Sequence, residues 1–440
     1  MILYDIGFLI FSLFYIPTLI FKGKLHKDFL ERFGVYDDIK LDRLFRAKDV
    51  IWIQAVSVGE VALCKSLIPL VKREFPEHSI VLSTITKTGN DLAKKLFSGE
   101  AEVVYFPLDF SFTAKKAIGK IRPKLYIMIE TEIWPNVLRA LRDKRVPAVL
   151  INGRISDRSY GKYKLVKRFL ANTLDDIAIF CMQSDVDARR IISIGAKADR
   201  VRVTGTMKFD IDALLDVTPS SGVKEMFGLT GGERIFVAGS THGGEEEAVV
   251  SAYKDLIAEH PGLKLIIAPR HIDRVAEVEN IINRLGLKAV RMSRERSDKE
   301  PGSETGSAAA SGPDKRSPYQ VYIMDKIGYL NDAYSIAEIV FIGGSLIPHG
   351  GQNPIEPAVF EKPIVFGPYM FNFRTVASLF LKNDAAMQVK SGEELYSAVD
   401  RILKDADAGI ALGKNAKKVI TENRGASLRN LSAIEELTRG

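Results

Sequence analysis

The chain has 440 residues, a length that exceeds one ordinary hydrophobic core and predicts two or three domains. Apolar residues make up 46% of the chain and charged residues 27%, which is ordinary for a globular protein. The two cysteines, Cys64 and Cys181, exclude a disulfide framework and favour a reducing compartment, and no spacing of Cys and His resembles a zinc site. A net charge of +7 suits a protein that meets anionic ligands or an anionic membrane surface, although many soluble enzymes are equally basic.

An apolar run at residues 6–21 opens the chain, and Lys22, Lys24 and Lys27 follow it at once. The run is shorter than the roughly 20 residues that a perpendicular membrane span needs. A cleaved signal peptide would need a positive charge before the run and small residues after it, and the sequence has neither. A buried core helix is the other alternative. Because the lysines follow the run, we expect residues 1–21 to form an uncleaved membrane anchor with the rest of the chain in the cytoplasm.

From residue 50 onward, short apolar runs alternate with amphipathic helical runs. Continuous apolar strands that alternate with helices predict a parallel sheet covered by helices on both faces. The expected strands of a first sheet are residues 50–56, 79–85, 102–107, 124–130 and 147–152.

The pattern stops at residues 213–233, which are rich in turn formers, and then restarts. The expected strands of a second sheet are residues 234–240, 263–269, 288–292, 319–325, 338–344 and 363–367. We therefore expect two doubly wound α/β domains, at residues 22–212 and 234–440, with ligands beyond the carboxyl ends of the strands. A single large sheet with an excursion is the alternative. Residues 293–318 carry no large apolar side chain and predict a disordered surface insertion without a catalytic role.

Acidic residues follow two strands of the first expected sheet. Glu60 lies in the first turn of a helix, where it either complements the helix dipole or projects into the site as a general base. Glu130 begins a cluster of two acids and a tryptophan, and a buried carboxylate there would need a partner. Thr131 or Glu132 could simply cap the next helix. Arg154, after the following strand, offers a cation to an anionic group.

The second expected domain has polar or glycine-rich loops after four of its strands, at residues 239–242, 268–271, 325–329 and 343–357. Glycine pairs let backbone N–H groups crowd a phosphate, and a helix that begins near Pro354 points its positive end at the same place. Arg270 can pair with a phosphate, and Glu356 can accept hydrogen bonds from ribose hydroxyls. Each loop is a weak signal alone, but four at successive strand ends predict a nucleotide site.

Segments along nearly the whole chain resemble the 3-deoxy-D-manno-octulosonic acid (Kdo) transferase family. They include AVSVGE at 55–60, ETEIWPN at 130–136, VTGTMKFD at 203–210, GSTHGGEEE at 239–247 and GGSLIPHGGQNPIEP at 343–357. The resemblance implies the GT-B glycosyltransferase fold, in which two Rossmann-like domains face an interlobe cleft. It implies that the N-terminal domain binds the acceptor and the C-terminal domain the CMP-sugar, with the C-terminal helix packed back on the first domain.

The resemblance also implies an activity: metal-independent transfer of Kdo from CMP-Kdo to the lipid A precursor lipid IVA, in lipopolysaccharide biosynthesis. It implies no cofactor, no nucleic acid partner, contact with membrane lipids, and a place at the cytoplasmic side of the cell inner membrane. The general base falls on Glu60 and a second essential acid on Glu130. The CMP contacts fall on Pro269, Arg270, Ile327, Gly328, Tyr329, Asn353, Pro354, Ile355 and Glu356.

Two residues depart from the family pattern. Gln352 stands where the family usually has histidine, and Tyr329 stands where it often has an acid. Both departures concern single side-chain contacts within the expected site. Two other functions stay open: a GT-B transferase that uses another nucleotide sugar, and a membrane-tethered nucleotide-binding regulator without catalysis. The number of Kdo residues transferred does not follow from these residues.

Overall fold

The computed structural model describes residues 4–10, 13, 28–46, 49–210, 222–227, 229, 232–293 and 319–439. The chain divides into two compact units. One unit comprises Met1–Ile211 and Asn423–Gly440, and the other comprises Asp212–Glu422. Each unit contains one seven-stranded sheet, and every strand pair in both sheets is parallel.

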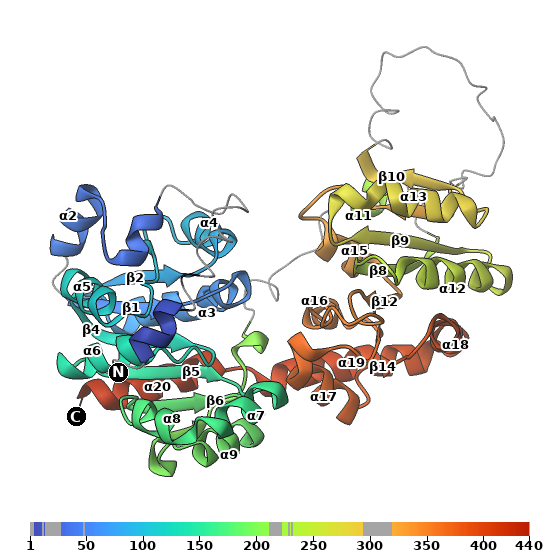
Figure 1. The fold of residues 1–440 in the computed structure, drawn as a ribbon. Helices are drawn as coiled ribbons and strands as arrows, with labels where there is room; N and C mark the ends of the chain where they lie inside the picture. Colours follow the sequence, from blue (N-terminus) through green and yellow to red (C-terminus); the bar gives the residue numbers. More distant parts are fainter. Residues whose placement is uncertain are drawn as a thin grey trace. The chain divides into compact units, whose positions relative to one another are not determined.

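The first unit is built on a sheet with strand order β3-β2-β1-β4-β5-β6-β7 (Figure 1). Its strands are β1 (Asp49–Gln54), β2 (His78–Thr84), β3 (Glu102–Tyr105), β4 (Pro123–Ile129), β5 (Ala148–Gly153), β6 (Ile179–Met182) and β7 (Val201–Val203). The chain runs from β1 outward to β3 and then returns to β4 on the other side of β1. The topological switch point therefore lies between β1 and β4, where open α/β sheets bind their ligands.

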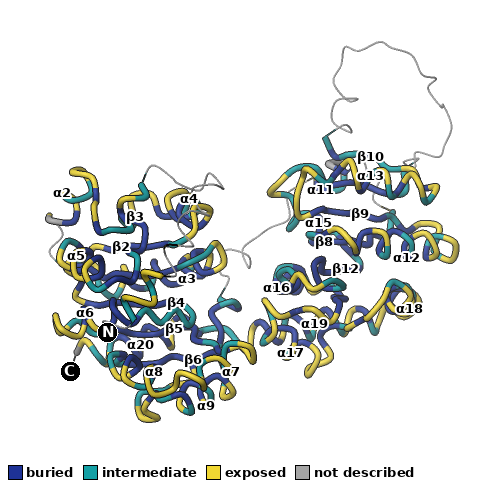
Figure 2. The backbone as a smooth tube through the Cα atoms, viewed as in Figure 1, coloured by how far each residue is buried: buried dark blue, intermediate teal, exposed yellow. Residues whose placement is uncertain are grey.

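Helices cover both faces of this sheet. They are α2 (Asp38–Arg46), α3 (Val58–Glu74), α4 (Lys87–Leu96), α5 (Ser111–Ile121), α6 (Pro135–Asp143), α7 (Asp157–Leu165), α8 (Lys167–Leu174), α9 (Asp185–Ser193) and α20 (Ala426–Arg439). One buried apolar cluster contains residues of α3, α4 and α20, and a second contains residues of α5, α6, α8 and α9. The strands are buried while the outer helix surfaces are exposed (Figure 2). The C-terminal helix α20 thus contributes to the core of the first unit.

The second unit has a sheet of order β10-β11-β9-β8-β12-β13-β14. Its strands are β8 (Arg234–Thr241), β9 (Leu263–Pro269), β10 (Ala289–Arg291), β11 (Val321–Ile323), β12 (Ile339–Ile342), β13 (Ile364–Phe366) and β14 (Met387–Gln388). Its helices are α11 (Val223–Met226), α12 (Glu246–Glu259), α13 (Val275–Arg284), α15 (Leu330–Ile336), α16 (Ile355–Val359), α17 (Arg374–Lys382), α18 (Gly392–Lys404) and α19 (Ala406–Asn423). The switch point of this sheet lies between β8 and β12.

Short 3-10 helices complete the described elements: η1 (Phe29–Phe33), η2 (Ala198–Arg200), η3 (Met207–Phe209), η4 (Ile272–Arg274) and η5 (Phe371–Phe373). The expected insertion at 293–318 lies outside the described residues apart from Ser293, and most of the expected linker at 213–233 does so too. Where that linker is described, it contains helix α11.

The expected anchor at residues 1–21 falls largely outside the described part of the chain. Residues 4–10 are helical and lie on the first unit, where the Tyr4 hydroxyl donates to Asp109 at 2.8 Å. The ring of Phe8 meets that of Phe110 edge-on, with centroids 4.9 Å apart. Among the helices that the structure describes, none combines the length and the apolar character that a membrane crossing requires. The described residues therefore give no support to a spanning anchor.

Candidate functional site

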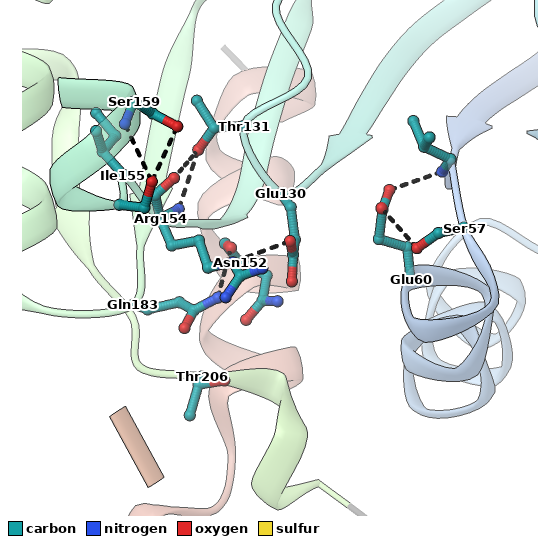
Figure 3. A network of polar contacts seen from close by, with 12 residues as sticks. Ser57, Glu60, Glu130, Thr131, Asn152, Arg154, Ile155, Ser159, Gln183 and Thr206 are labelled. Atoms are coloured by element: carbon teal, nitrogen blue, oxygen red, sulfur yellow. Dashed lines mark hydrogen bonds and ion pairs between the residues drawn. The ribbon is translucent and has the colours of Figure 1, made fainter. Parts of the chain in front are cut away.

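Glu60 lies in the first turn of α3, directly beyond the carboxyl end of β1. Its carboxylate accepts the backbone N–H of Val56 at 2.6 Å and the hydroxyl of Ser57 at 3.0 Å (Figure 3). The residue is only 6% exposed. Burial raises the pKa of Glu60 to about 8, the charges of Glu130 and Glu132 raise it further, and the two hydrogen bonds oppose this. The side chain of Glu60 therefore accepts hydrogen bonds at the N-terminus of its helix, and its carboxyl group can exchange a proton near neutral pH.

Glu130 follows β4, the strand beside β1, and its backbone is strained. Its φ of +60° is in the left-handed region, which costs a non-glycine residue free energy and persists only where the surrounding structure fixes it. The carboxylate accepts the Nε–H of Arg154 at 3.0 Å (Figure 3). The backbone N–H of Arg154 in turn donates to the Thr131 hydroxyl at 3.0 Å. Arg154 is thus the partner that a partly buried Glu130 requires, and these contacts orient both side chains.

The helix-capping role that Thr131 or Glu132 could have had belongs to Asp109. The carboxylate of Asp109 accepts two backbone N–H groups of the first turn of α6, at 3.2 and 2.9 Å. The carboxylate of Glu132 makes no hydrogen bond or ion pair with the residues that the structure describes. Burial raises the pKa of Glu132 to about 7, and the charge of Glu130 adds to the rise. Glu132 is therefore a second carboxyl group with a raised pKa in the cluster that contains Glu60 and Glu130.

Lys208, in η3, lies within the electrostatic range of this cluster and was not singled out in the sequence. Burial lowers the pKa of Lys208 to about 8, Glu130 opposes the shift and Arg154 adds to it. Asn152, the next-to-last residue of β5, has a φ of +52°, and its side-chain oxygen accepts the backbone N–H of Met207 at 3.0 Å. Its side-chain nitrogen is buried and has no partner among the described residues. In the sequence, Lys208 stands between the apolar residues Met207 and Phe209, and this pattern is the feature that could have indicated a buried lysine.

Three imidazoles gather at the carboxyl edge of the second sheet, on loops that follow β8, β9 and β12. The rings of His242 and His349 stack with centroids 4.4 Å apart, and His271 meets His242 edge-on at 5.7 Å. Burial lowers the pKa of His242 to about 4, and the two other histidines lower it further. The side-chain nitrogen of Gln352 lies 3.1 Å from Nε2 of His242. Over the described residues, no group of three His, Cys, Asp or Glu side chains has a metal-binding arrangement.

The expected nucleotide residues of β9 and α16 lie close enough to interact. Pro269 ends β9, and Arg270 follows it as an exposed residue. Oε1 of Glu356 accepts the side-chain N–H of Asn353 at 3.1 Å. Burial raises the pKa of Glu356, while Asn353 and the charge of Arg270 lower it. The structure thus brings a cation, an amide and a carboxylate together on one edge of the sheet.

The other expected nucleotide residues occupy two neighbouring positions on that edge. Ile327 and Gly328 lie in the loop between β11 and α15. Ile327 is 86% exposed, Gly328 has a φ of +103°, and Tyr329 occupies the N-cap position of α15. Because β11 pairs with β9, this loop follows the strand adjacent to the one that carries Arg270. Pro354 precedes α16, which has only five residues, and the side chain of Ile355 is fully buried.

Comparison with known proteins identifies the family. Residues 27–211 match the family model described as 3-deoxy-D-manno-octulosonic-acid transferase (kdotransferase). A 3-deoxy-D-manno-octulosonic acid transferase of Haemophilus influenzae is 30% identical over 407 residues, which cover 92% of this chain and 90% of that protein. A bifunctional glycosyltransferase/methyltransferase of Fusobacterium nucleatum subsp. nucleatum is 36% identical over 361 residues, or 81% of this chain. The chain spans about half of that relative's length, since the match covers 53% of it.

A solved glycosyltransferase structure from Rickettsia africae resembles this fold with a TM-score of 0.60 and 13% identity, over 89% of this chain and 100% of that one. At this identity the likeness concerns the fold alone, and it agrees with two parallel α/β sheets in the GT-B arrangement. The family assignment rests on the relative from H. influenzae, which matches this chain over nearly its full length. The chain belongs to the family of 3-deoxy-D-manno-octulosonic acid (Kdo) transferases and is a glycosyltransferase of that type.

Proposed function

We propose that this chain transfers Kdo from CMP-Kdo to the lipid A precursor of lipopolysaccharide biosynthesis, with Glu60 as the general base. The observation that carries the proposal is the buried carboxyl group of Glu60, at the switch point of the first sheet in a chain of this family. Its pKa of about 8 lies near the operating pH, which is where a general base combines adequate ionisation with adequate basicity.

The reaction is a displacement at the anomeric carbon of Kdo. An acceptor hydroxyl oxygen attacks this carbon, and its proton passes to the carboxylate of Glu60. The bond between the anomeric carbon and the phosphate oxygen breaks, and CMP leaves with the electron pair. A phosphate is already a good leaving group, so positive groups around it can stabilise the departing charge without a general acid.

We propose that the second unit binds CMP at the edge formed by Pro269–Arg270, Ile327–Tyr329 and Asn353–Glu356. Arg270 supplies an exposed guanidinium for the phosphate, and the carboxylate of Glu356 supplies acceptors for the ribose hydroxyls. The interaction of Arg270 with Glu356 supports a shared ligand, because a phosphate and a ribose of one nucleotide lie side by side. We also propose that no metal takes part. Turnover that survives EDTA and does not rise with added Mg²⁺ is the expected result.

We propose that Glu130, held by Arg154, is the second essential acid and sets the electrostatic environment of Glu60. Burial is the main cause of the raised pKa of Glu60, and the negative charge of Glu130 raises it further because it opposes ionisation of a second carboxyl group. We further propose that the reaction takes place at the cytoplasmic face of the inner membrane, where a lipid acceptor is accessible. Retention of the full chain in membranes washed with high salt is the expected result.

The direct test is a mass spectrum of purified lipid A precursor after incubation with the protein and CMP-Kdo. The expected result is a product heavier by whole Kdo units, with release of CMP, and far less product over the same incubation time with the Glu60→Gln variant. Thermal stabilisation by CMP but not by UMP or UDP separates this function from a transferase with another donor. An unmodified acceptor together with stabilisation by UDP would contradict the proposal.

A further inference from the structure

A single buried carboxylate, that of Glu245, ties together the two loops that flank the switch point of the second sheet. Glu245 occupies the N-cap position of α12, its side chain makes no hydrogen bond to that helix, and it is 0% exposed. Its Oε1 accepts the backbone N–H of His242 at 2.9 Å and that of Gly344. Its Oε2 accepts the backbone N–H of Leu346 at 3.3 Å. The first of these donors follows β8 and the other two follow β12, so the side chain bridges two different loops.

The loop after β12 packs so closely that its backbone must be held in place. A Cβ at Gly343 would lie 2.2 Å from the carbonyl oxygen of Ser240, so only glycine permits this approach of the two loops. Gly344 has a φ of +67°, a conformation that side chains other than glycine rarely adopt. Glycine-rich backbone loses much conformational entropy on folding, and three hydrogen bonds to one charged acceptor offset that cost.

The same loop leads directly to the residues proposed to bind the nucleotide. The backbone N–H of Gly351 donates to the carbonyl of Gly344 at 2.8 Å, and that of Gln352 donates to the carbonyl of Gly343 at 3.1 Å. The loop therefore closes on Gly343 and Gly344, and Glu245 holds the second of these through its backbone N–H. Asn353 and Glu356 follow at once in the chain.

We propose that Glu245 is a positioning residue for donor binding, which fixes the glycine-rich loop so that Asn353 and Glu356 are in place before CMP arrives. This inference rests on the proposed CMP site and adds a residue that does not itself touch the ligand. Preorganisation of this kind increases affinity because the free protein does not have to order the loop when the ligand binds.

The experiment compares CMP affinity in the wild type and in Glu245→Gln, which keeps the size of the side chain but replaces an acceptor oxygen with an NH₂ group. The matched control is Glu338→Gln. Glu338 pairs with Arg234 at 2.8 Å and joins the same two strands, β8 and β12, at their opposite, amino ends. Both variants lose a charged contact between the segments of β8 and β12, but only Glu245→Gln removes a contact to the glycine-rich loop after β12.

We expect Glu245→Gln to raise the dissociation constant for CMP and the KM for CMP-Kdo by roughly 2- to 30-fold, the range for residues that act on a site without contacting the ligand. The KM for the acceptor stays unchanged. Glu338→Gln lowers the melting temperature without changing CMP affinity. Equal CMP affinity in wild type and Glu245→Gln would overturn the inference, and so would an equal loss in both variants. Failure of CMP to bind to the wild type would instead overturn the proposed function.

Hydrogen exchange of the wild type tests the same inference without a variant, in case Glu245→Gln does not fold. The amides of Gly344 and Leu346 are expected to exchange slowly in the free protein, because both are bonded to Glu245. CMP is then expected to add little protection to these two amides. Fast exchange in the free protein that becomes slow only with CMP would show that the loop is ordered by the ligand, and would contradict a prior role for Glu245.

Discussion

Glu60 combines two roles that its sequence position leaves open as alternatives. As a capping residue it accepts the N–H of Val56 and the hydroxyl of Ser57, as first-turn acids in helices often do. As a titrating group it is buried next to two other carboxyl groups, which a purely structural cap does not require. A helix cap is most effective when fully ionised, so a pKa raised to about 8 weakens the cap at neutral pH. This cost is the physical reason to assign Glu60 a chemical role.

The substitution Glu60→Gln separates the two roles. Glutamine keeps one acceptor oxygen for the helix start but cannot take the proton of the acceptor hydroxyl. We expect turnover to fall by a factor on the order of 10² to 10⁴, the usual contribution of a general base. CMP affinity stays unchanged, since the residues proposed to bind the nucleotide belong to the other unit. A variant with a small loss of melting temperature and near-normal turnover would assign Glu60 to helix capping alone.

The raised pKa of Glu60 also predicts two opposite pH dependences. We expect turnover to rise with pH through about 8, because the proposed base is active only when it is ionised. The free energy of unfolding falls as the pH rises from 4.5, the ordinary pKa of a glutamate, to about 8, the pKa of Glu60 in the folded protein. In this range the unfolded chain has lost a proton that the folded protein still holds, so a rise in pH favours the unfolded state. Melting temperatures of the wild type measured between pH 5 and 9 should therefore fall more steeply than those of Glu60→Gln. Glu132, with a pKa of about 7, leaves a residual slope in both proteins. Parallel melting curves would contradict the buried environment of Glu60.

At the residue scale, the sequence identifies the acids but not their partners. Glu60 and Glu130 stand out because each follows an apolar strand. That Asp109, rather than Thr131 or Glu132, caps α6 depends on contacts between segments distant in the sequence. The contribution of Lys208 depends in the same way on its burial near Glu130. Partners of this kind become visible only when the fold is known.

At the scale of the elements, the sequence predicts the strands with long apolar runs well and the shortest strands poorly. Every strand expected from such a run is present, although most are shorter at the carboxyl end. Ala55 and Phe106, for example, lie just past β1 and β3 but stay buried, so hydropathy extends the run beyond the hydrogen-bonded strand. Of the strands that the structure describes, three were not expected from the sequence: β6, β7 and β14, which have four, three and two residues. β7 and β14 lie at sheet edges, whereas β6 is buried between β5 and β7. β7 reads Val-Arg-Val and two of its three residues are exposed, so it has no continuous apolar run that would mark it as a strand.

The segment between β10 and β11 permits a prediction at the same scale. The two strands pair directly from Ala289 with Val321 to Arg291 with Ile323, and Ser293 donates its N–H to Asp325 at 3.0 Å. The ends of the expected insertion are therefore already held together by the sheet. We expect replacement of residues 295–316 by a short Gly-Ser linker to leave turnover and melting temperature nearly unchanged, because loop closure costs only about 0.6 kcal/mol per doubling of length. A large loss of turnover would show that the insertion contacts the acceptor or a partner protein.

At the scale of the whole molecule, the two units have sheets that are built in the same way. Both units place a first strand in the middle of a parallel sheet, build outward, and return to its other side. Each switch point then lies between the first strand and a later one. Residues with proposed roles lie there: Glu60 and Glu130 in the first unit, and Glu245 with the Gly344 backbone that it holds in the second. The alternation of strands and helices predicts this arrangement from sequence. The return of α20 to the first unit is a matter of tertiary packing, which α20 achieves through apolar residues such as Leu431 and Ile434.

This division of the chain predicts how a ligand affects each unit. If CMP binds at the carboxyl edge of the second sheet, its binding free energy stabilises that unit, by about 2.7 kcal/mol at a concentration 100 times the dissociation constant. Hydrogen exchange with saturating CMP should then slow in peptides from β8, β9 and β12 and in residues 343–356. Peptides from β1 and β4 in the first unit should exchange as before. Arg270→Ala serves as the control, because loss of the guanidinium should abolish the protection at the same CMP concentration without changing exchange in the free protein. Protection that appears in β1 and β4 instead would place the nucleotide on the first unit. The donor would then bind to the first unit and the acceptor to the second, the reverse of the proposed assignment.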